Sequence, residues 1–303
     1  MRIGMTLMRQ RRSPVAKMGE FLAAVASQGF LQQALLAGLL ASLGCGLIGP
    51  FVIIKRIAFL AGGIAHSVLG GMGAAVYFGF DPLLGALLAA VLAALLIGWV
   101  RLTWHTGEDT AIGALWAIGM AVGILFISRT PGYTTDLMSF LFGNILLVPA
   151  RELGFMAVLD LLLLGTVGLF YRQFVAVAFD EEFARLRGVP VALFYLLLLV
   201  LVAITVVLMI QVVGLILVIA LLTLPAAVAG QWTRSLAAMM LVATLLGAAL
   251  TSAGLALSYA PDLPAGPVII LLAGAIYLIS AVAAGIRARQ LARRAALQAG
   301  VIR

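Results

Sequence analysis

The chain has 303 residues, of which 64% are hydrophobic and only 10% are charged, and its mean hydropathy is +1.21. A water-soluble protein carries about a quarter charged residues, so this composition excludes a soluble globular domain and indicates that lipid is the solvent for much of the chain. The net charge of +8 does not indicate nucleic-acid binding, because the basic residues flank the apolar stretches, as signals of membrane topology do.

Apolar stretches of about 20 residues, long enough to cross a bilayer as helices, recur along the chain. We therefore predict an all-α polytopic membrane bundle of about eight or nine transmembrane helices at 30–286. A basic tail precedes it at 1–29, and a basic cytoplasmic tail follows at 287–303. The predicted spans lie near 30–54, 61–79, 83–100, 111–128, 152–171, 191–210, 212–230, 235–258 and 267–286.

The distribution of Lys and Arg predicts which loops face the cytoplasm. If the C-terminal tail is cytoplasmic, nine spans place twelve of the nineteen Lys and Arg residues inside. Only Arg129 and Arg151 lie outside, and the other five belong to the N-terminal tail. This distribution follows the rule that positive charges stay on the cytoplasmic side.

The N-terminal tail does not fit this scheme, because nine spans place its five basic residues outside. Three explanations are open: the first span is interrupted at Gly49-Pro50, the tail lies on a membrane surface, or translation begins at Met18.

Ionisable residues inside spans are costly, so they mark candidate functional sites. His66 could ligate a metal ion, carry a proton or donate a hydrogen bond to a carbonyl group. The same span contains glycines at positions 62, 63, 70, 71 and 73. They favour a functional role, because they allow another backbone or a translocation path to approach. Asp160 lies midway along the span 152–171, where a proton relay, a pairing with arginine and a packing role are all open.

The loop before residue 191 contains an amphipathic segment, predicted as a helix at 179–189. Its acidic residues come first (Asp180, Glu181 and Glu182) and its basic residues come last (Arg185 and Arg187), as the helix dipole favours. Gly188 and Pro190 then end the helix. Its periodicity fits either a membrane-surface element or a docking element for a partner.

Six segments of the chain resemble, in the same order, the signature of the zinc, manganese and iron permeases of ABC transporters. They are Lys55–Gly71, Glu108–Gly113, Asp136–Leu146, Asp180–Gly188, Val213–Ala227 and Asp262–Pro267. The chain has no Walker A motif, so it cannot hydrolyse ATP by that route and is not expected to be an enzyme.

This resemblance implies a bundle similar to that of metal and vitamin B12 importers, placed in a bacterial-type inner membrane. It implies a homodimer that binds cytoplasmic ABC ATPase subunits and an extracytoplasmic metal-binding protein, with a transported divalent metal ion and no permanent cofactor. It also implies that the predicted helix at 179–189 couples the permease to the ATPase. The coupling residues would be Asp180, Glu181, Glu182, Arg185 and Gly188.

The resemblance transfers one metal ligand, His66, in the translocation path. Many family members, especially manganese permeases, carry aspartate four residues before this histidine, whereas this chain has Gly62. Imidazole suits zinc better than it suits a hard cation, so zinc is expected, with manganese or iron as alternatives. Two other classes remain open: an ion-coupled secondary transporter that uses His66 and Asp160, and a scaffold that transports nothing.

Overall fold

The computed structural model describes residues 21, 23–104, 108–130, 143, 145–259, 261 and 263–298, and every regular element in these ranges is helical. The all-α prediction is therefore confirmed. The helices are α2 (Gly29–Ile54), α3 (Ala58–Tyr77), α4 (Pro82–Trp104), α5 (Glu108–Arg129), the 3-10 helix η1 (Ile145–Leu147), α7 (Ala150–Leu169), α8 (Tyr171–Phe179), α9 (Glu181–Leu186), α10 (Val191–Val213), α11 (Leu215–Trp232), α12 (Leu236–Tyr259) and α13 (Ala265–Gln298).

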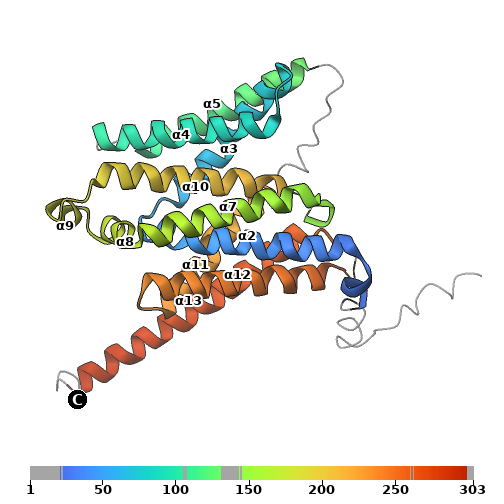
Figure 1. The fold of residues 1–303 in the computed structure, drawn as a ribbon. Coiled ribbons are helices and arrows are strands. Elements are labelled where there is room, and N and C mark those ends of the chain that lie inside the picture. Colours follow the sequence, from blue (N-terminus) through green and yellow to red (C-terminus); the bar gives the residue numbers. More distant parts are fainter. Residues whose placement is uncertain are drawn as a thin grey trace, which may run out of the picture.

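Eight of these helices are long and apolar enough to cross a membrane: α2, α3, α4, α5, α7, α11, α12 and α13. Helix α10 is a further apolar helix of 23 residues. The predicted spans are therefore confirmed to within a few residues at most ends. The main difference is α13, which continues to Gln298 and extends beyond the rest of the bundle (Figure 1).

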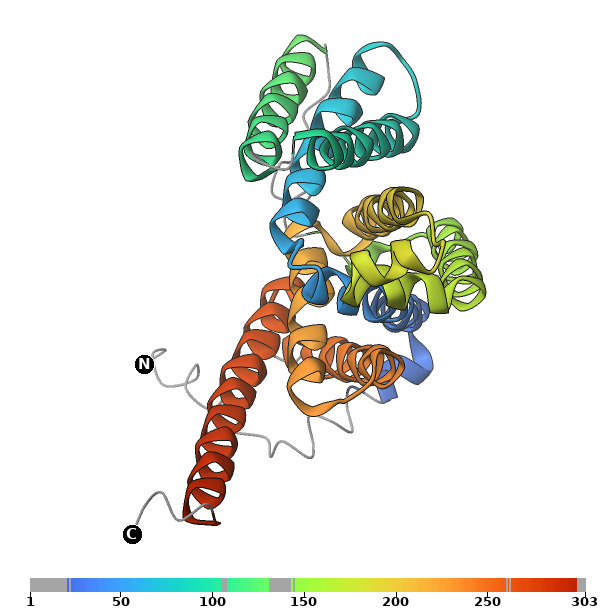
Figure 2. The ribbon, with the colours of Figure 1, turned by 90° about the vertical axis from the view of Figure 1, so that its left-hand side faces the viewer.

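The bundle has two regions, which Figures 1 and 2 show from two sides. Helices α3, α4 and α5 pack on one another and form one side of the molecule, which we call the three-helix unit. In the remainder, α2 is central and contacts α7, α10, α11 and α12. Helix α10 joins the two regions, because it packs against α4 and α3 as well as against α2 and α11.

Glycines bring α3 into very close contact with both of its partners in the three-helix unit. A Cβ atom added at Gly70 would lie 2.8 Å from the carbonyl oxygen of Gly119 in α5. At Gly71 an added Cβ would overlap the carbonyl oxygen of Gly85 in α4. Small residues at helix contacts are typical of packing in lipid, where close backbone approach provides van der Waals attraction.

Helix α2 passes through Gly49-Pro50 without interruption. Gly49 lies against the backbone of α11, where an added Cβ would overlap the carbonyl oxygen of Leu222. The first span is therefore not broken at this point, which removes one of the three explanations for the basic N-terminal tail. The tail up to residue 20, including Met18, lies outside the described residues.

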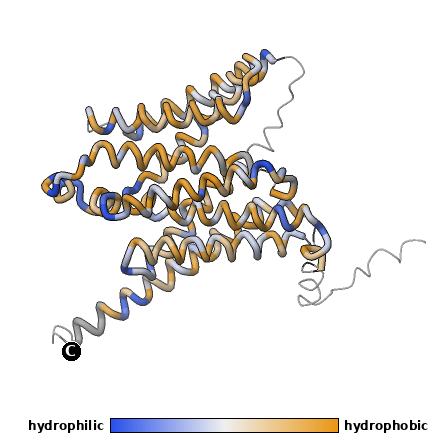
Figure 3. The backbone as a smooth tube through the Cα atoms, viewed as in Figure 1, coloured by the Kyte–Doolittle hydropathy of each residue, from blue (hydrophilic) through white to orange (hydrophobic). Residues whose placement is uncertain are grey.

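The loops predicted to be cytoplasmic meet at one end of the bundle. Figure 3 shows apolar residues along the lengths of the helices and hydrophilic residues mainly at their ends. Lys55 after α2 and Arg101 in the last turn of α4 both contact Glu181 at the start of α9. This contact agrees with the topology inferred from the basic residues, and we call this side the α9 end.

Candidate functional site

His66 lies in α3 at the boundary with α5. Its imidazole ring stacks on the indole ring of Trp116, with ring centroids 4.1 Å apart and an interplanar angle of 7°. The side chain is half-buried. A stacked neighbour covers a face of the ring, whereas a metal ion binds a nitrogen lone pair in the ring plane. The stack with Trp116 is therefore compatible with metal binding by His66.

Gly62 lies one helical turn before His66, and it is the glycine of this span at which an added Cβ would meet no overlap. A Cβ added there would find its nearest neighbour, the Cδ1 atom of Ile219, at 4.0 Å. At Gly63 an added Cβ would instead overlap the side chain of Ile112 in α5. Gly70, Gly71 and Gly73 likewise face the backbones of α5 or α4. The prediction that the glycines admit another backbone is confirmed for Gly70, Gly71 and Gly73, whereas Gly62 has room for a Cβ atom beside Ile219.

A single imidazole is not a complete metal site, since zinc commonly has three or four protein ligands. In the described part of the chain, no group of three or more His, Cys, Asp or Glu residues could hold a metal ion together. His66 could thus provide one ligand, but the described residues of one subunit do not supply a set of three such side chains.

Asp160 in α7 is 2% exposed, and its two carboxylate oxygens have no hydrogen-bond partner among the described residues. It faces α2, where a Cβ added at Gly44 would lie 2.8 Å from Oδ1 and 3.2 Å from the Cε atom of Met209 in α10. These contacts do not support the pairing with arginine that the sequence left open. His66 packs on α5 instead, so the two residues of the secondary-transporter hypothesis have different surroundings.

The predicted helix at 179–189 is shorter in the structure, where α9 spans Glu181–Leu186 and a separate helix, α8, ends just before it. Asp180 has an extended backbone (φ −150°, ψ 98°) that separates α8 from α9, and its carboxylate accepts a hydrogen bond of 2.9 Å from the amide of Phe183. This aspartate is thus an N-cap, which satisfies a free amide of the first turn. Phe179 ends α8 instead of beginning the coupling helix.

Gly188 ends this segment in the way the sequence indicated. Its φ of +75° is a left-handed conformation that a residue with a side chain adopts only with strain. Its amide donates to the carbonyl of Arg185 at 3.0 Å, and the amide of Val189 donates to Ala184 at 3.0 Å. Replacing the glycine would therefore strain the turn into α10.

Helix α9 and the last residue of α8 present apolar and charged side chains to the outside of the bundle. Phe179, Phe183 and Leu186 are 63%, 50% and 83% exposed, and Glu182 and Arg185 are exposed beside them. We call these five residues the α9 face. Large exposed apolar side chains next to charges are typical of a surface that another protein or the membrane covers.

Glu181 does not belong to the α9 face, because it points into the bundle. Its carboxylate accepts hydrogen bonds from Lys55 and from Arg101, whose Nη2 atom lies 3.3 Å away. Lys55 also donates to the carbonyl of Val177 at 2.9 Å, and Arg101 donates to the hydroxyl of Tyr195 at 2.9 Å. One carboxylate thus connects α9 with the ends of α2 and α4. The sequence pattern did not reveal this link, because its members are far apart in the chain.

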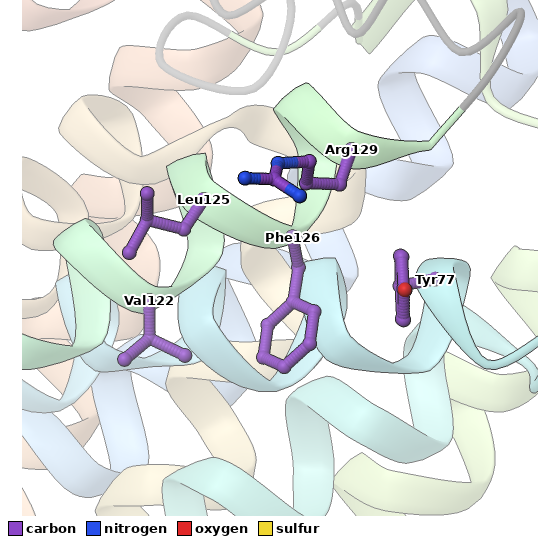
Figure 4. Close-up of a pocket in the computed structure, with 5 residues that line it drawn as sticks. All are labelled: Tyr77, Val122, Leu125, Phe126 and Arg129. Atoms are coloured by element: carbon purple, nitrogen blue, oxygen red, sulfur yellow. The ribbon is translucent and has the colours of Figure 1, made fainter.

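Two cavities lie at the two ends of the α3–α5 pair. Figure 4 shows an open pocket of about 320 Å³ at the end of α3 away from α9, lined by Tyr77, Val122, Leu125, Phe126 and Arg129. A smaller cavity of about 80 Å³ at the α9 end includes Lys55, Arg101 and Asp109 in its lining. His66 lies between these two cavities along α3.

The segment 136–142 and Asp262 from the sequence signature lie outside the described residues.

Comparison with known proteins gives consistent matches over most of the chain. Residues 27–284 match the family described as the ABC 3 transport family. The chain is 41% identical to a probable metal transport system membrane protein of Chlamydia muridarum, over 81% of this chain and 86% of that protein. It is 35% identical to the manganese transport system membrane protein MntC of Halalkalibacterium halodurans, over 84% and 87% of the two chains. In the solved structure of PsaBC from Streptococcus pneumoniae in complex with Fab, one chain matches with a TM-score of 0.79 and 32% identity, over 87% of this chain and 95% of that chain.

Proposed function

This chain belongs to the ABC 3 transport family, as a multi-pass membrane permease of a metal-ion importer, and we propose that its cargo is zinc and that a separate ATPase powers transport. The observation that carries the choice of zinc is the pair Gly62 and His66 on α3. The imidazole is present, and the position one turn before it on the same helix is a glycine, which provides no carboxylate. Imidazole ligands suit zinc, whereas carboxylate oxygens suit manganese.

Two copies of the chain would form the transport pathway. One imidazole per subunit is too few for a tight zinc site, so we propose a homodimer in which both His66 side chains line a shared path. Weak coordination suits a transit site, because an ion that is held too strongly would not leave. A metal-binding protein would deliver the ion at the outer end of α3, where the pocket of Figure 4 opens.

Manganese is the second candidate, and the relatives support it. The Halalkalibacterium halodurans protein at 35% identity is named as a manganese transport protein. A direct comparison of the two metals therefore has to decide between them.

Helix α9 would dock on the ATPase through the α9 face, and Glu181 would pass the movement on. This carboxylate contacts Lys55, which follows α2, and Arg101, which belongs to α4. Helix α4 packs directly on α3, which carries His66. A shift of α9 would thus reach the metal site through one salt-bridged contact and one helix contact, as in switches that move packed helices.

The test is uptake of zinc and of manganese by cells that lack their own high-affinity systems, with the ATPase and the binding protein supplied. We expect uptake that requires the ATPase and prefers zinc, and a loss of at least about tenfold in His66→Ala, since one of few ligands is removed. Membrane levels of the variant are the control. A preference for manganese at equal concentrations would contradict the assignment to zinc. Uptake by the permease alone, driven by a proton gradient, would contradict the ATP-driven mechanism.

A further inference from the structure

Trp116 is placed to control the orientation of His66. The indole and imidazole rings are nearly parallel, with the angle of 7° and the centroid distance of 4.1 Å that define a face-to-face contact. Parallel stacking restricts the tilt of the imidazole ring, so the direction in which its nitrogen lone pair points depends on the plane of the indole ring.

The indole ring is itself fixed by its surroundings. Its Nε1 donates to the sulfur of Met120, one turn further along α5, at 3.1 Å. Phe59 of α3 contacts the ring at a centroid distance of 6.1 Å and an interplanar angle of 44°. Backbone contacts between α3 and α5 then hold the two helices in register, since a Cβ at Gly119 would lie 2.5 Å from the Cα atom of Ser67. The plane of the indole is therefore set by the packing of α3 on α5.

We propose that Trp116 is a positioning residue for the transported ion, and that it acts by fixing the plane of the His66 ring. This inference rests on the proposed function of His66. The indole face also attracts positive charge, and an imidazole that binds a divalent cation is more electron-poor than the free ring. The stack therefore stabilises the metal-bound form more than the empty form.

A simple packing role is the alternative, and the location of Trp116 makes it testable. The indole is partly exposed, and it covers His66 instead of filling the buried core. Truncating it should thus affect metal binding more than folding. Trp99 of α4 provides a matched control, because it is 54% exposed and contacts another aromatic ring, Trp104, without touching His66.

The experiment uses the complete importer in proteoliposomes, with zinc chloride as the probe. Trp116→Leu should raise the half-saturating zinc concentration roughly twofold to tenfold, with little change in maximal rate, as expected for the loss of one aromatic contact. Trp116→Phe retains an aromatic face and should lose less. Trp99→Leu should behave as the parent. In the double variant His66→Ala with Trp116→Leu, uptake should fall no further than in His66→Ala alone, because Trp116 acts through His66.

Fluorescence provides a second readout, which tests whether zinc binds at His66 beside Trp116. Zinc should alter the indole emission of the parent and of Trp99→Leu, and this response should vanish in Trp116→Leu and in His66→Ala. A parental half-saturation in Trp116→Leu, with uptake impaired in His66→Ala, would overturn the positioning role and leave the proposed site intact. Parental uptake in His66→Ala would overturn both. If Trp116→Leu lowers the free energy of unfolding by as much as it lowers the free energy of zinc binding, the residue is structural.

Discussion

The two regions of the bundle each contain an ionisable side chain within the membrane helices, but they surround it in different ways. In the three-helix unit, His66 is half-buried at a helix boundary, where it stacks on Trp116. In the remainder, Asp160 is enclosed by α2, α7 and α10, and its carboxylate oxygens have no partner among the described residues. An accessible side chain can exchange an ion in this conformation, whereas an enclosed one can do so only if the helices separate. We therefore propose that ion transit uses the three-helix unit, in line with the proposed role of His66.

The largest expected effect comes from breaking the link between the two regions. Glu181 joins the end of α2, in one region, to the end of α4, in the other. Glu181→Gln should reduce zinc uptake about tenfold while the ATPase still copurifies and hydrolyses ATP, because the ionic contacts that transmit movement are weakened. Uptake and ATP hydrolysis are measured on the same proteoliposomes.

The exposed neighbour Glu182 is the control for this variant. Glu182→Arg reverses a charge on the α9 face, so it should release the ATPase during purification instead of uncoupling it. If Glu181→Gln transports zinc at the parental rate, Glu181 does not transmit movement. If Glu182→Arg retains the ATPase fully, the α9 face is not the docking surface.

A smaller effect is expected when the site in the three-helix unit gains a carboxylate. Gly62→Asp places a carboxylate one turn from His66, at a position where an added Cβ would be in ordinary contact with Ile219 and overlap nothing. Uptake of manganese relative to zinc should rise several-fold, because carboxylate oxygens favour manganese. The measurement is competition between the two ions in the same cells. Gly62→Asn, which has nearly the same size without the charge, should shift the ratio less, and an unchanged ratio in Gly62→Asp would show that the two positions do not share a site.

The smallest effect on transport is expected in the enclosed region. Asp160→Asn removes only the ionisable group, because the amide stays buried without a described partner, so the free energy of unfolding should change by less than about 1 kcal/mol, with uptake reduced at most twofold. Thermal unfolding of the purified permease measures the first quantity. If Asp160→Asn abolishes uptake while the amount of protein in the membrane is unchanged, ion transit is not confined to the three-helix unit.

The segment at 179–189 and the span of His66 show which structural features the sequence pattern could predict and which it could not. The acidic start and the glycine stop of the segment at 179–189 were sufficient to predict a short helix, because capping is a local interaction. The break at Asp180 was missed, since the same aspartate could equally lie within a continuous helix. In the span of His66, five glycines look alike in the sequence, and only their neighbours in α4, α5 and α11 show that an added Cβ would avoid overlap at Gly62 alone.

The sequence by itself determined that this protein crosses a membrane many times, because segment length and the absence of charge follow directly from the thickness and polarity of the bilayer. It also determined the bounds of most helices and singled out His66, since an ionisable residue in an apolar span is rare and costly. The tertiary structure decided that His66 stacks on Trp116, that Glu181 joins α9 to α2 and α4, and that Asp160 is enclosed. These contacts join residues far apart in the chain, and they depend on how closely each pair of helices can approach.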